Sequence, residues 1–237
     1  MKRLSSLFIF LLAACATAPK NLTTAEGTMA EGERLLKDEF YEEARNQFYR
    51  IKTEFPQSSL QLEADLKIAE SYFLDESYVA AATAYEDFIR TYPGRKEIPM
   101  ALNQLGQCYL RQMPSTPQRD TRATVKVVDV FTRLMIDYPD SEYAATAPQH
   151  IEKARNQLAR KIFDIGEFYE RSRDYDAAVR RFEELQNQYP DSALVEEAMA
   201  RQVRCLRKAG KTELADKARK DFQEKFPKSE FATMMTQ

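Results

Sequence analysis

Residues 166–190 read GEFYERSRDYDAAVRRFEELQNQYP, and they contain the pattern from which the fold is predicted. Its small, aromatic and leucine residues stand at helical spacing: Gly166, Tyr169, Ala178, Phe182 and Leu185. Side chains three, four or seven residues apart lie on one face of a helix. Pro190 ends the stretch, because a proline cannot continue a helix. The stretch therefore predicts two helices that pack closely against each other before the chain turns.

The same markers recur in phase along the chain. An aromatic residue precedes a proline at five places: Phe55-Pro56, Tyr92-Pro93, Tyr138-Pro139, Tyr189-Pro190 and Phe226-Pro227. In four of them a serine stands two residues after the proline: Ser58, Ser141, Ser192 and Ser229. Proline biases the residue before it toward an extended conformation, and serine is a preferred helix cap. Each copy therefore predicts a helix stop followed by a helix start.

Twelve residues before each proline stands a small or compact residue: Ala44, Ala81, Val127, Ala178 and Ala215. The residues four further on are Phe48, Tyr85, Phe131, Phe182 and Arg219, and those seven further on are Ile51, Phe88, Leu134, Leu185 and Phe222. Upstream, a second pattern recurs as Gly32/Leu35, Ala69/Tyr72, Gly106/Tyr109, Gly166/Tyr169 and, degraded, Val203/Leu206. Together the patterns resemble the tetratricopeptide repeat. We expect an all-α, right-handed superhelical solenoid of about five tetratricopeptide-like helix pairs, in which the last repeat, with its degraded pattern, is the cap.

The spacing of the prolines locates two insertions. Successive prolines stand 37, 46, 51 and 37 residues apart, which defines a unit of 37. Nine extra residues fall between Tyr109 and Val127, in a polar loop that contains Met113 and Pro114. Fourteen extra residues precede the fourth repeat, and at about 1.5 Å each they add roughly 21 Å of helix. The spacing predicts one long helix from near Pro148 to about Arg171.

This long helix predicts how the repeats are grouped. Residues 25–140 would hold repeats 1 to 3, and residues 141–237 would hold repeats 4 and 5 together with the long connecting helix.

The N-terminus has the pattern of a bacterial export signal. Lys2 and Arg3 form a positive region, and Leu4 to Leu12 is an apolar run of nine residues. A membrane-spanning helix needs about 20 apolar residues, so this run predicts a cleaved signal and not an anchor helix.

Residues 12–15, Leu-Ala-Ala-Cys, resemble a lipobox. This resemblance implies that residues 1–14 are removed, that diacylglycerol is attached to the sulfur of Cys15, and that residues 15–24 form a lipid-anchored linker. An ordinary secretory signal with a chance cysteine is the alternative.

Charge and composition limit the classes of function. The chain has 35 basic and 37 acidic side chains; without Lys2 and Arg3 the balance is 33 to 37, or about −4, which argues against general nucleic-acid binding. Residues 21–100 hold 9 basic and 16 acidic side chains, whereas residues 201–237 hold 10 and 5. Solvated faces explain such runs, and an electrostatically matched protein partner is the alternative.

The sequence lacks the residues that most catalytic or metal sites need. His150 is the only histidine, which leaves no His-based metal site and no Ser-His-Asp triad. Cys108 and Cys205 are isolated thiols that we expect to be buried without a disulfide. Gly-rich phosphate loops and C-x-x-C motifs do not occur. We expect no enzyme, no metal and no cofactor apart from the covalent lipid on Cys15.

Solenoids bind proteins through the concave surface that the first helix of each repeat lines. Counting three residues back and four residues on from the small residue of each first helix gives a row of Met29, Leu36, Leu66, Phe73, Asn103 and Leu110. With Leu74 and Met100 alongside, this row predicts an apolar substrate groove. An apolar row of this kind suits an extended peptide with aromatic side chains. The alternative is that these residues are helix-packing core.

Four stretches carry a resemblance to a known family: Phe40-Tyr41-Glu42-Glu43-Ala44, Ala84-Tyr85-Glu86-Asp87-Phe88-Ile89-Arg90-Thr91-Tyr92-Pro93, Gln118-Arg119-Asp120 and Tyr138-Pro139-Asp140-Ser141-Glu142-Tyr143. With the lipobox, the five repeats and the two insertions, they make the chain from Ala25 to about Phe226 resemble the BamD (ComL) family. These are lipoprotein subunits of the outer-membrane β-barrel assembly (BAM) machinery. The resemblance implies a non-catalytic scaffold, lipid-anchored on the periplasmic side of the cell outer membrane.

The resemblance also implies partners. In this family the N-terminal repeats are thought to receive the C-terminal signal of unfolded outer-membrane barrel proteins, and the C-terminal repeats hold a POTRA domain of the subunit BamA. Other BAM lipoproteins are further partners. An arginine of the fourth repeat faces BamA in the family; it corresponds to Arg181, beside Arg180. The match departs after Pro93, where family members often have His-Pro and this chain has Gly94-Arg95.

Two other functions stay open. Similar repeats occur in lipoproteins that assemble a pilus secretin or coordinate envelope constriction, although those relatives usually lack the long helix of the fourth repeat. A murein-cleaving lipoprotein with a helical solenoid would need an additional catalytic domain, and no residues are left to build one.

Overall fold

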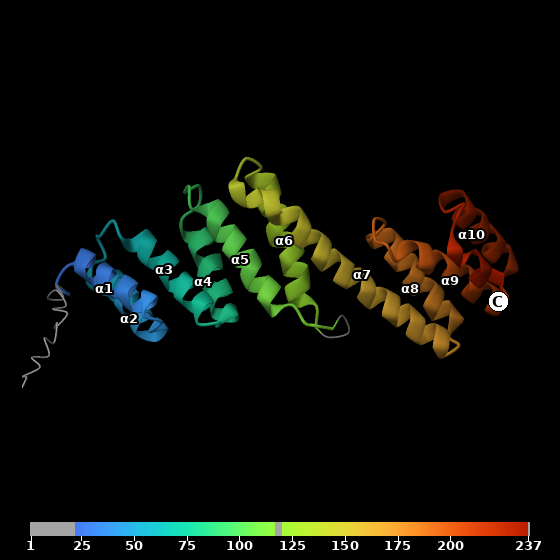
Figure 1. The fold of residues 1–237 in the computed structure, drawn as a ribbon, viewed down its shortest axis with the longest axis horizontal. Coiled ribbons are helices and arrows are strands. Elements are labelled where there is room, and N and C mark those ends of the chain that lie inside the picture. The colour runs from blue at the N-terminus through green and yellow to red at the C-terminus, as the bar shows by residue number, and fades with distance from the viewer. Residues whose placement is uncertain (1–21, 117–119, 237) are drawn as a thin grey trace, which may run out of the picture. The chain divides into compact units, whose positions relative to one another are not determined.

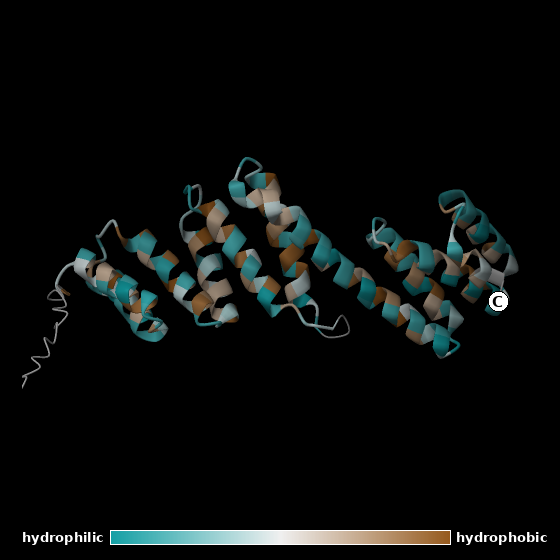
Figure 2. Cartoon of the chain, viewed as in Figure 1, coloured by the Kyte–Doolittle hydropathy of each residue, from teal (hydrophilic) through white to brown (hydrophobic). Residues whose placement is uncertain are grey.

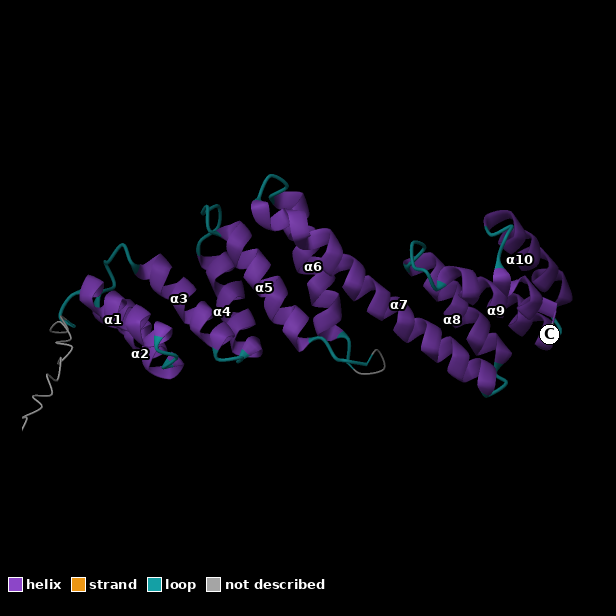
Figure 3. Ribbon diagram, in the orientation of Figure 1, coloured by secondary structure: helices purple, strands orange, loops and turns teal. Residues whose placement is uncertain are grey.

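The computed structural model describes residues 22–116 and 120–236, and all the regular secondary structure in these ranges is helical (Figure 3). The predicted signal peptide 1–14, the lipid-attachment residue Cys15 and the pair Gln118-Arg119 lie outside the described residues. None of the described helices is long and apolar enough to cross a membrane.

The described helices follow one another as first and second members of repeat pairs (Figure 1). The α-helices are α1 Ala25–Lys37, α2 Tyr41–Glu54, α3 Gln61–Leu74, α4 Tyr78–Thr91, α5 Ile98–Gln112, α6 Arg122–Asp137, α7 Ala147–Arg171, α8 Tyr175–Gln188, α9 Val195–Lys208 and α10 Thr212–Lys225. Two 3₁₀ helices are η1 Glu142–Thr146 and η2 Glu230–Thr236. The predicted all-α fold of tetratricopeptide-like pairs is confirmed; the hand of the superhelix stays a prediction.

The chain divides into two compact units whose boundary falls between Ala64 and Asp65, inside α3. In the first unit α1 packs against α2. In the second unit each helix from α4 to α10 packs against the next one along the chain. Hydrophobic and hydrophilic residues intersperse along the described helices, as burial of one helix face requires (Figure 2).

The small residue of a first helix lies against an aromatic ring of the second helix. A Cβ added at Gly106 would stand 2.5 Å from Cζ of Phe131, and one added at Gly32 would stand 2.5 Å from Cε1 of Phe48. Only the hydrogen of glycine leaves room for the ring at this distance. The predicted small residues of the second helices, Ala44, Ala81, Val127, Ala178 and Ala215, are all fully buried.

A left-handed residue joins the two helices in four repeats. The angle φ is 65° at Glu39, 55° at Glu76, 62° at Arg173 and 74° at Gly210. The N–H of the following residue donates to a carbonyl five residues back, as from Asp174 N to the oxygen of Tyr169 at 3.0 Å. This is the Schellman ending of a helix, which favours glycine at the left-handed position.

The aromatic-proline turns join one repeat to the next. Each aromatic residue donates its N–H to the carbonyl four residues back and accepts a hydrogen bond from the backbone three residues on, as Tyr189 does from Ser192 N at 3.0 Å. The predicted role of the serines is only partly right. Ser58, Ser141, Ser192 and Ser229 accept from the N–H two residues on, so they close a turn instead of capping the next α-helix directly.

The 25 residues of α7 lie where the long helix is predicted, and Pro148 occupies its first turn. Its two halves pack against different repeats. On the first half, the ring of His150 lies 4.7 Å from that of Phe131 in α6. On the second half, the ring centroids of Phe163 and Phe182 in α8 are 5.8 Å apart. The extra turns of α7 therefore connect two helix pairs that a regular repeat would stack directly.

The two described cysteines are free thiols buried in these packed faces. Burial raises the pKa of the Cys108 thiol and of the Cys205 thiol to about 12 each, so both stay protonated at neutral pH.

Candidate protein-binding site

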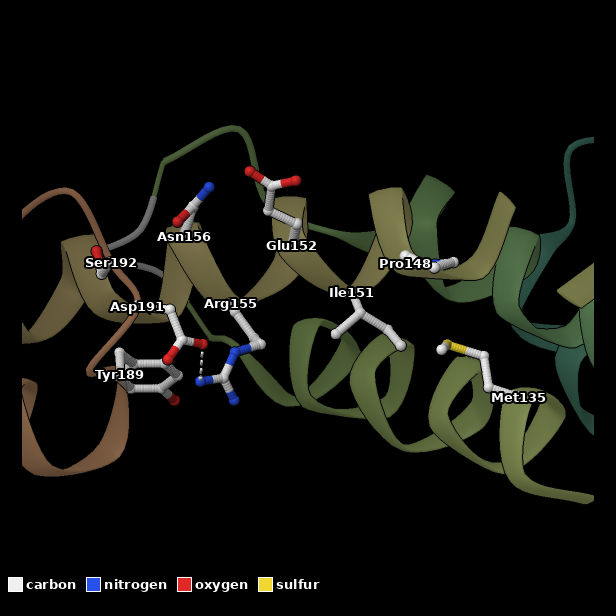
Figure 4. Close-up of a pocket in the computed structure, with 9 residues that line it drawn as sticks. All are labelled: Met135, Pro148, Ile151, Glu152, Arg155, Asn156, Tyr189, Asp191 and Ser192. Carbon is white, nitrogen blue, oxygen red and sulfur yellow. Dashed lines mark hydrogen bonds and ion pairs between the residues drawn. The ribbon is translucent and has the colours of Figure 1, made fainter. Parts of the chain in front are cut away.

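A hollow of about 490 Å³ lies where the end of α6, the first half of α7 and the segment between α8 and α9 meet (Figure 4). The residues that line it are Met135, Pro148, Ile151, Glu152, Arg155, Asn156, Tyr189, Asp191 and Ser192. The extra turns of α7 bring its wall residues here. The 14-residue insertion is therefore the signal that could have located this site, which the sequence analysis missed.

Arg155 organises the polar end of the hollow. Its Nη2 lies 3.3 Å from Oδ2 of Asp191 and donates to the carbonyl oxygen of Gln188 at 3.4 Å. The guanidinium also lies over the ring of Tyr189, 5.2 Å from its centroid. Burial raises the pKa of the Tyr189 hydroxyl, so this hydroxyl stays neutral beside the arginine.

The opposite end of the hollow is apolar. Met135 of α6 faces Ile151 and Pro148 of α7 (Figure 4). The next residue of α6, Ile136, is 72% exposed. A hollow with one apolar end and one charged end suits an amphipathic protein segment, because the apolar side chains supply the contact area and the arginine orients it.

The predicted partner residues Arg180 and Arg181 lie in the middle of α8. Arg180 is exposed, and 42% of the Arg181 side chain is exposed while its guanidinium donates to Glu184 one turn on. An exposed ion pair of this kind contributes little to folding, so Arg181 is available to a partner.

The basic C-terminal end is partly compensated within the fold. Glu170 of α7, with only 10% of its side chain exposed, lies 2.9 Å from Arg201 and 2.6 Å from Arg204 of α9. Lys211 pairs with Asp176 at 2.9 Å. The expectation of a basic surface for an acidic partner therefore loses part of its support, because these cations are already neutralised.

The structure corrects two of the predicted groove residues. Met29 and Leu36 are 5% and 9% exposed, so for them the alternative of core packing holds. They belong to the first unit. In the second unit Leu66, Phe73, Met100 and Leu110 are half-buried and Leu74 is 44% exposed.

The remaining groove residues come from α3 and α5. The ring of Phe73 packs edge-on against Tyr78 of α4, with centroids 5.5 Å apart, which fixes its orientation. That the residues of α3 and α5 form one continuous groove stays a prediction.

Comparisons with known proteins give one consistent family. The model of a family described as "YfiO: Outer membrane lipoprotein" matches residues 23–222. The outer membrane protein assembly factor BamD of Neisseria meningitidis serogroup A is 28% identical over 219 residues, which cover 89% of this chain and 82% of the relative. The protein of the same name from Rickettsia prowazekii is 29% identical over 190 residues, 80% of this chain and 74% of the relative.

The similarity of this chain to solved structures is weaker. The TPR2AB domain of yeast Sti1, in a complex with pHSP90, is 16% identical with a TM-score of 0.44, covering 89% of this chain and 80% of that one. A thermophilic TPR protein of Thermus thermophilus is 14% identical with a TM-score of 0.40, covering 90% of this chain and 100% of that one.

Proposed function

The chain belongs to the YfiO family of outer membrane lipoproteins, the family of the assembly factor BamD, and we propose that it serves the β-barrel assembly machinery as a non-catalytic scaffold. The observation that carries this proposal is the family match, which spans residues 23–222 and so includes parts of all five repeats. The scaffold would act at the periplasmic face of the outer membrane, where unfolded barrel proteins must reach the machinery.

The C-terminal repeats, in this proposal, hold a POTRA domain of the barrel subunit BamA. Arg181 and Arg180 of α8 would contact this partner, because both guanidiniums are accessible and Arg181 has only a weak internal ion pair. The hollow around Arg155 lies at the C-terminal end of the same helix and would extend the contact with an apolar wall.

The N-terminal repeats would bind the C-terminal signals of unfolded barrel proteins. The supporting observation is the set of apolar side chains on first helices that keep exposed area: Leu66, Phe73, Leu74, Met100 and Leu110. Aromatic and aliphatic side chains of an extended peptide gain free energy by covering such area.

Lipid on Cys15 would tie the scaffold to the membrane. Radiolabelled palmitate should label the full-length protein in cells, and Cys15→Ala should give a soluble or uncleaved product without label. A wild-type protein that takes up no palmitate would leave the scaffold without this anchor.

Charge reversal tests the BamA surface. Arg181→Glu should abolish co-purification with BamA from detergent-solubilised membranes, since like charges at an interface cost several kcal/mol. Arg90→Glu on α4 is the matched control, because Arg90 also has an i,i+3 ion pair and is 78% exposed. Recovery of BamA at the wild-type level by Arg181→Glu would remove this arginine from the interface.

Truncation tests the substrate groove. Leu66→Ala with Phe73→Ala should weaken binding of a synthetic C-terminal barrel-protein peptide and leave BamA recovery unchanged. Leu214→Ala, at a residue of α10 that is 55% exposed, is the control. Loss of both activities in the double variant, with lowered helicity by circular dichroism, would point to unfolding and not to a groove.

A further inference from the structure

A second hollow, of about 520 Å³, lies along the second half of α7, away from the hollow around Arg155. The α7 residues that line it are Arg160, Asp164, Ile165, Glu167, Phe168, Tyr169 and Arg171. Among them, Phe168 is 57% exposed. A single exposed aromatic residue is common on protein surfaces, so its position in the repeat decides whether it means more.

The repeat register sets Phe168 apart from its equivalents in the third and fifth repeats. It stands two residues after Gly166, the small residue of this first helix. The equivalent residue after Gly106 is Cys108, and the equivalent after Val203 is Cys205; both are fully buried. Of the third, fourth and fifth repeats, only the fourth carries a large side chain at this position, and this side chain is exposed to solvent.

Ile165 shows the same departure one residue before Gly166. Its equivalents, Leu105 and Gln202, are 4% and 9% exposed, whereas Ile165 is half-buried. In the fifth repeat the cover comes from α8, since Gln186 donates to Gln202 at 2.9 Å and Gln202 donates to Glu183 at 2.9 Å. In the fifth repeat the second helix of the preceding repeat therefore covers this face of the first helix.

The long α7 explains why this cover is missing. α6 is the second helix that precedes α7, and it runs along the first half of α7. Thr121, just before α6, accepts a hydrogen bond from Lys161 at 3.2 Å, and α6 continues from there toward His150. Ile165 and Phe168 lie beyond Lys161, where α6 no longer reaches.

The charges around Phe168 present a positive rim. Arg160 pairs with Asp164 at 2.7 Å, with 50% of the arginine side chain but only 17% of the aspartate side chain exposed. Arg171 lies 3.8 Å from Glu167, with exposed fractions of 69% and 21%. In both pairs the cation faces solvent and the carboxylate is largely covered, so an acidic partner would complement this surface.

We propose that Ile165 and Phe168, framed by Arg160 and Arg171, bind an amphipathic helix with acidic flanks from a partner protein. This helix takes the place that the second helix of the preceding repeat occupies in front of α5 and α9. Its apolar face covers Phe168, and its carboxylates meet the two arginines. The site is separate from Arg181 and from the groove on α3 and α5, and it stands whether or not those two surfaces bind BamA and substrate.

Photocrosslinking in intact cells tests this site. Full-length protein carrying benzoylphenylalanine at position 168 should form a protein adduct whose crosslinked peptide, mapped by mass spectrometry, lies on an acidic amphipathic helix of another protein. The matched control places the probe at Leu214, which is 55% exposed on α10, and should not give this adduct. Arg160→Glu with Arg171→Glu should lower the adduct yield roughly tenfold or more, because like charges then face the carboxylates.

Three outcomes overturn the proposal: no protein adduct at position 168, an adduct to a second copy of this chain, and an adduct whose peptide is extended or carries no acidic residues. An adduct yield that the double arginine variant leaves unchanged overturns the charge-based choice of partner. Phe168, Arg160 and Arg171 are all exposed, so the variants should stay folded. Circular dichroism of each variant checks this and so separates loss of binding from unfolding.

Discussion

The ring of Phe182 lies so close to Gly166 that a Cβ added to the glycine would stand 2.7 Å from Cε1 of the ring. The second helix thus fills the space in which a side chain of the first helix would lie. Gly106 and Phe131 repeat this relationship in the third helix pair, with a distance of 2.5 Å. In the pairs that carry a glycine at this position, the close approach of the two helices is therefore set by one missing side chain.

Gly166→Ala should destabilise the protein by up to about 2 kcal/mol. Alanine gains about 1 kcal/mol of helix propensity over glycine, but overpacking a tight core costs about 1 to 3 kcal/mol, and Phe182, whose ring the added methyl group would meet, is fully buried. Urea unfolding measures the difference. In a Phe182→Leu background the same change should cost nothing, because the smaller side chain leaves room; a stabilising Gly166→Ala in the wild type would contradict the contact.

Phe182→Ala should cost roughly 3 to 5 kcal/mol, since it leaves a cavity at the seam between α7 and α8. The loss should appear as a lower thermal midpoint and fraying of the C-terminal repeats by hydrogen exchange. Phe168→Ala is the control on the same helix pair and should change stability by less than about 0.5 kcal/mol, because Phe168 is exposed. Equal losses in the two variants would mean that Phe182 is not the seam residue.

Replacing the left-handed residues by glycine should stabilise the turns. Arg173, with φ at 62°, adopts a conformation that costs an L-residue about 1 kcal/mol, although glycine loses more chain entropy on folding. We expect a net gain of about 0.5 kcal/mol for Arg173→Gly and a loss of about 1 kcal/mol for Gly210→Ala, both by urea unfolding. This explanation would be wrong if Arg173→Gly lowered the free energy of unfolding and Gly210→Ala left it unchanged.

The pattern of the repeats predicts the core of each helix pair well, because each pair buries its own facing sides. Ala44, Ala178 and Phe182, which stand out in the sequence by spacing alone, are all fully buried. The spacing of the prolines likewise predicts the long helix, because 14 residues inserted in front of a first helix are accommodated most simply by lengthening that helix.

Contacts between repeats are harder to read from the sequence. Met29 and Leu36 have the spacing of groove residues but are buried, because periodicity gives a helix face and not the neighbour that covers it. Phe168 has the spacing of a covered residue but is exposed, because α6 ends its contact with α7 before reaching it. A search of the sequence for glycine also fails to find the left-handed turns, because Glu39, Glu76 and Arg173 occupy three of the four left-handed positions between paired helices.

Glu170→Gln should cost about 1 to 3 kcal/mol, because it removes the carboxylate that the partly buried guanidiniums of Arg201 and Arg204 share. Arg201 keeps its ion pairs with Glu167 and Glu197, so the loss falls mainly on Arg204. Thermal unfolding at two salt concentrations measures the loss, which should change little with salt for groups so covered. Asp137→Asn breaks the exposed pair with Arg133 and should have almost no effect. An unchanged stability of Glu170→Gln would mean that Arg204 does not depend on this carboxylate.

His150 should make the joint between α6 and α7 weaker at acid pH. Its ring lies on Phe131 and its Nε2 is 3.3 Å from Nε2 of Gln107, and burial, followed by the charge of Lys153, lowers the pKa of this histidine below its usual value. The folded state therefore favours the neutral ring, while the unfolded chain takes up a proton near the ordinary pKa of about 6.5. The stability that the neutral ring contributes is present above that pH and is lost as the pH falls through it.

Substitution of His150, the only histidine, isolates this effect. In His150→Gln the side chain keeps a polar group for Gln107 but does not titrate. The difference in unfolding free energy between wild type and this variant should be constant above about pH 7 and should shift against the wild type between about pH 7 and pH 5. Subtracting the variant removes the contribution of the carboxylates, which titrate in both proteins at lower pH. If the wild type instead gains stability relative to His150→Gln on acidification, the ring is protonated in the fold and a carboxylate must face it.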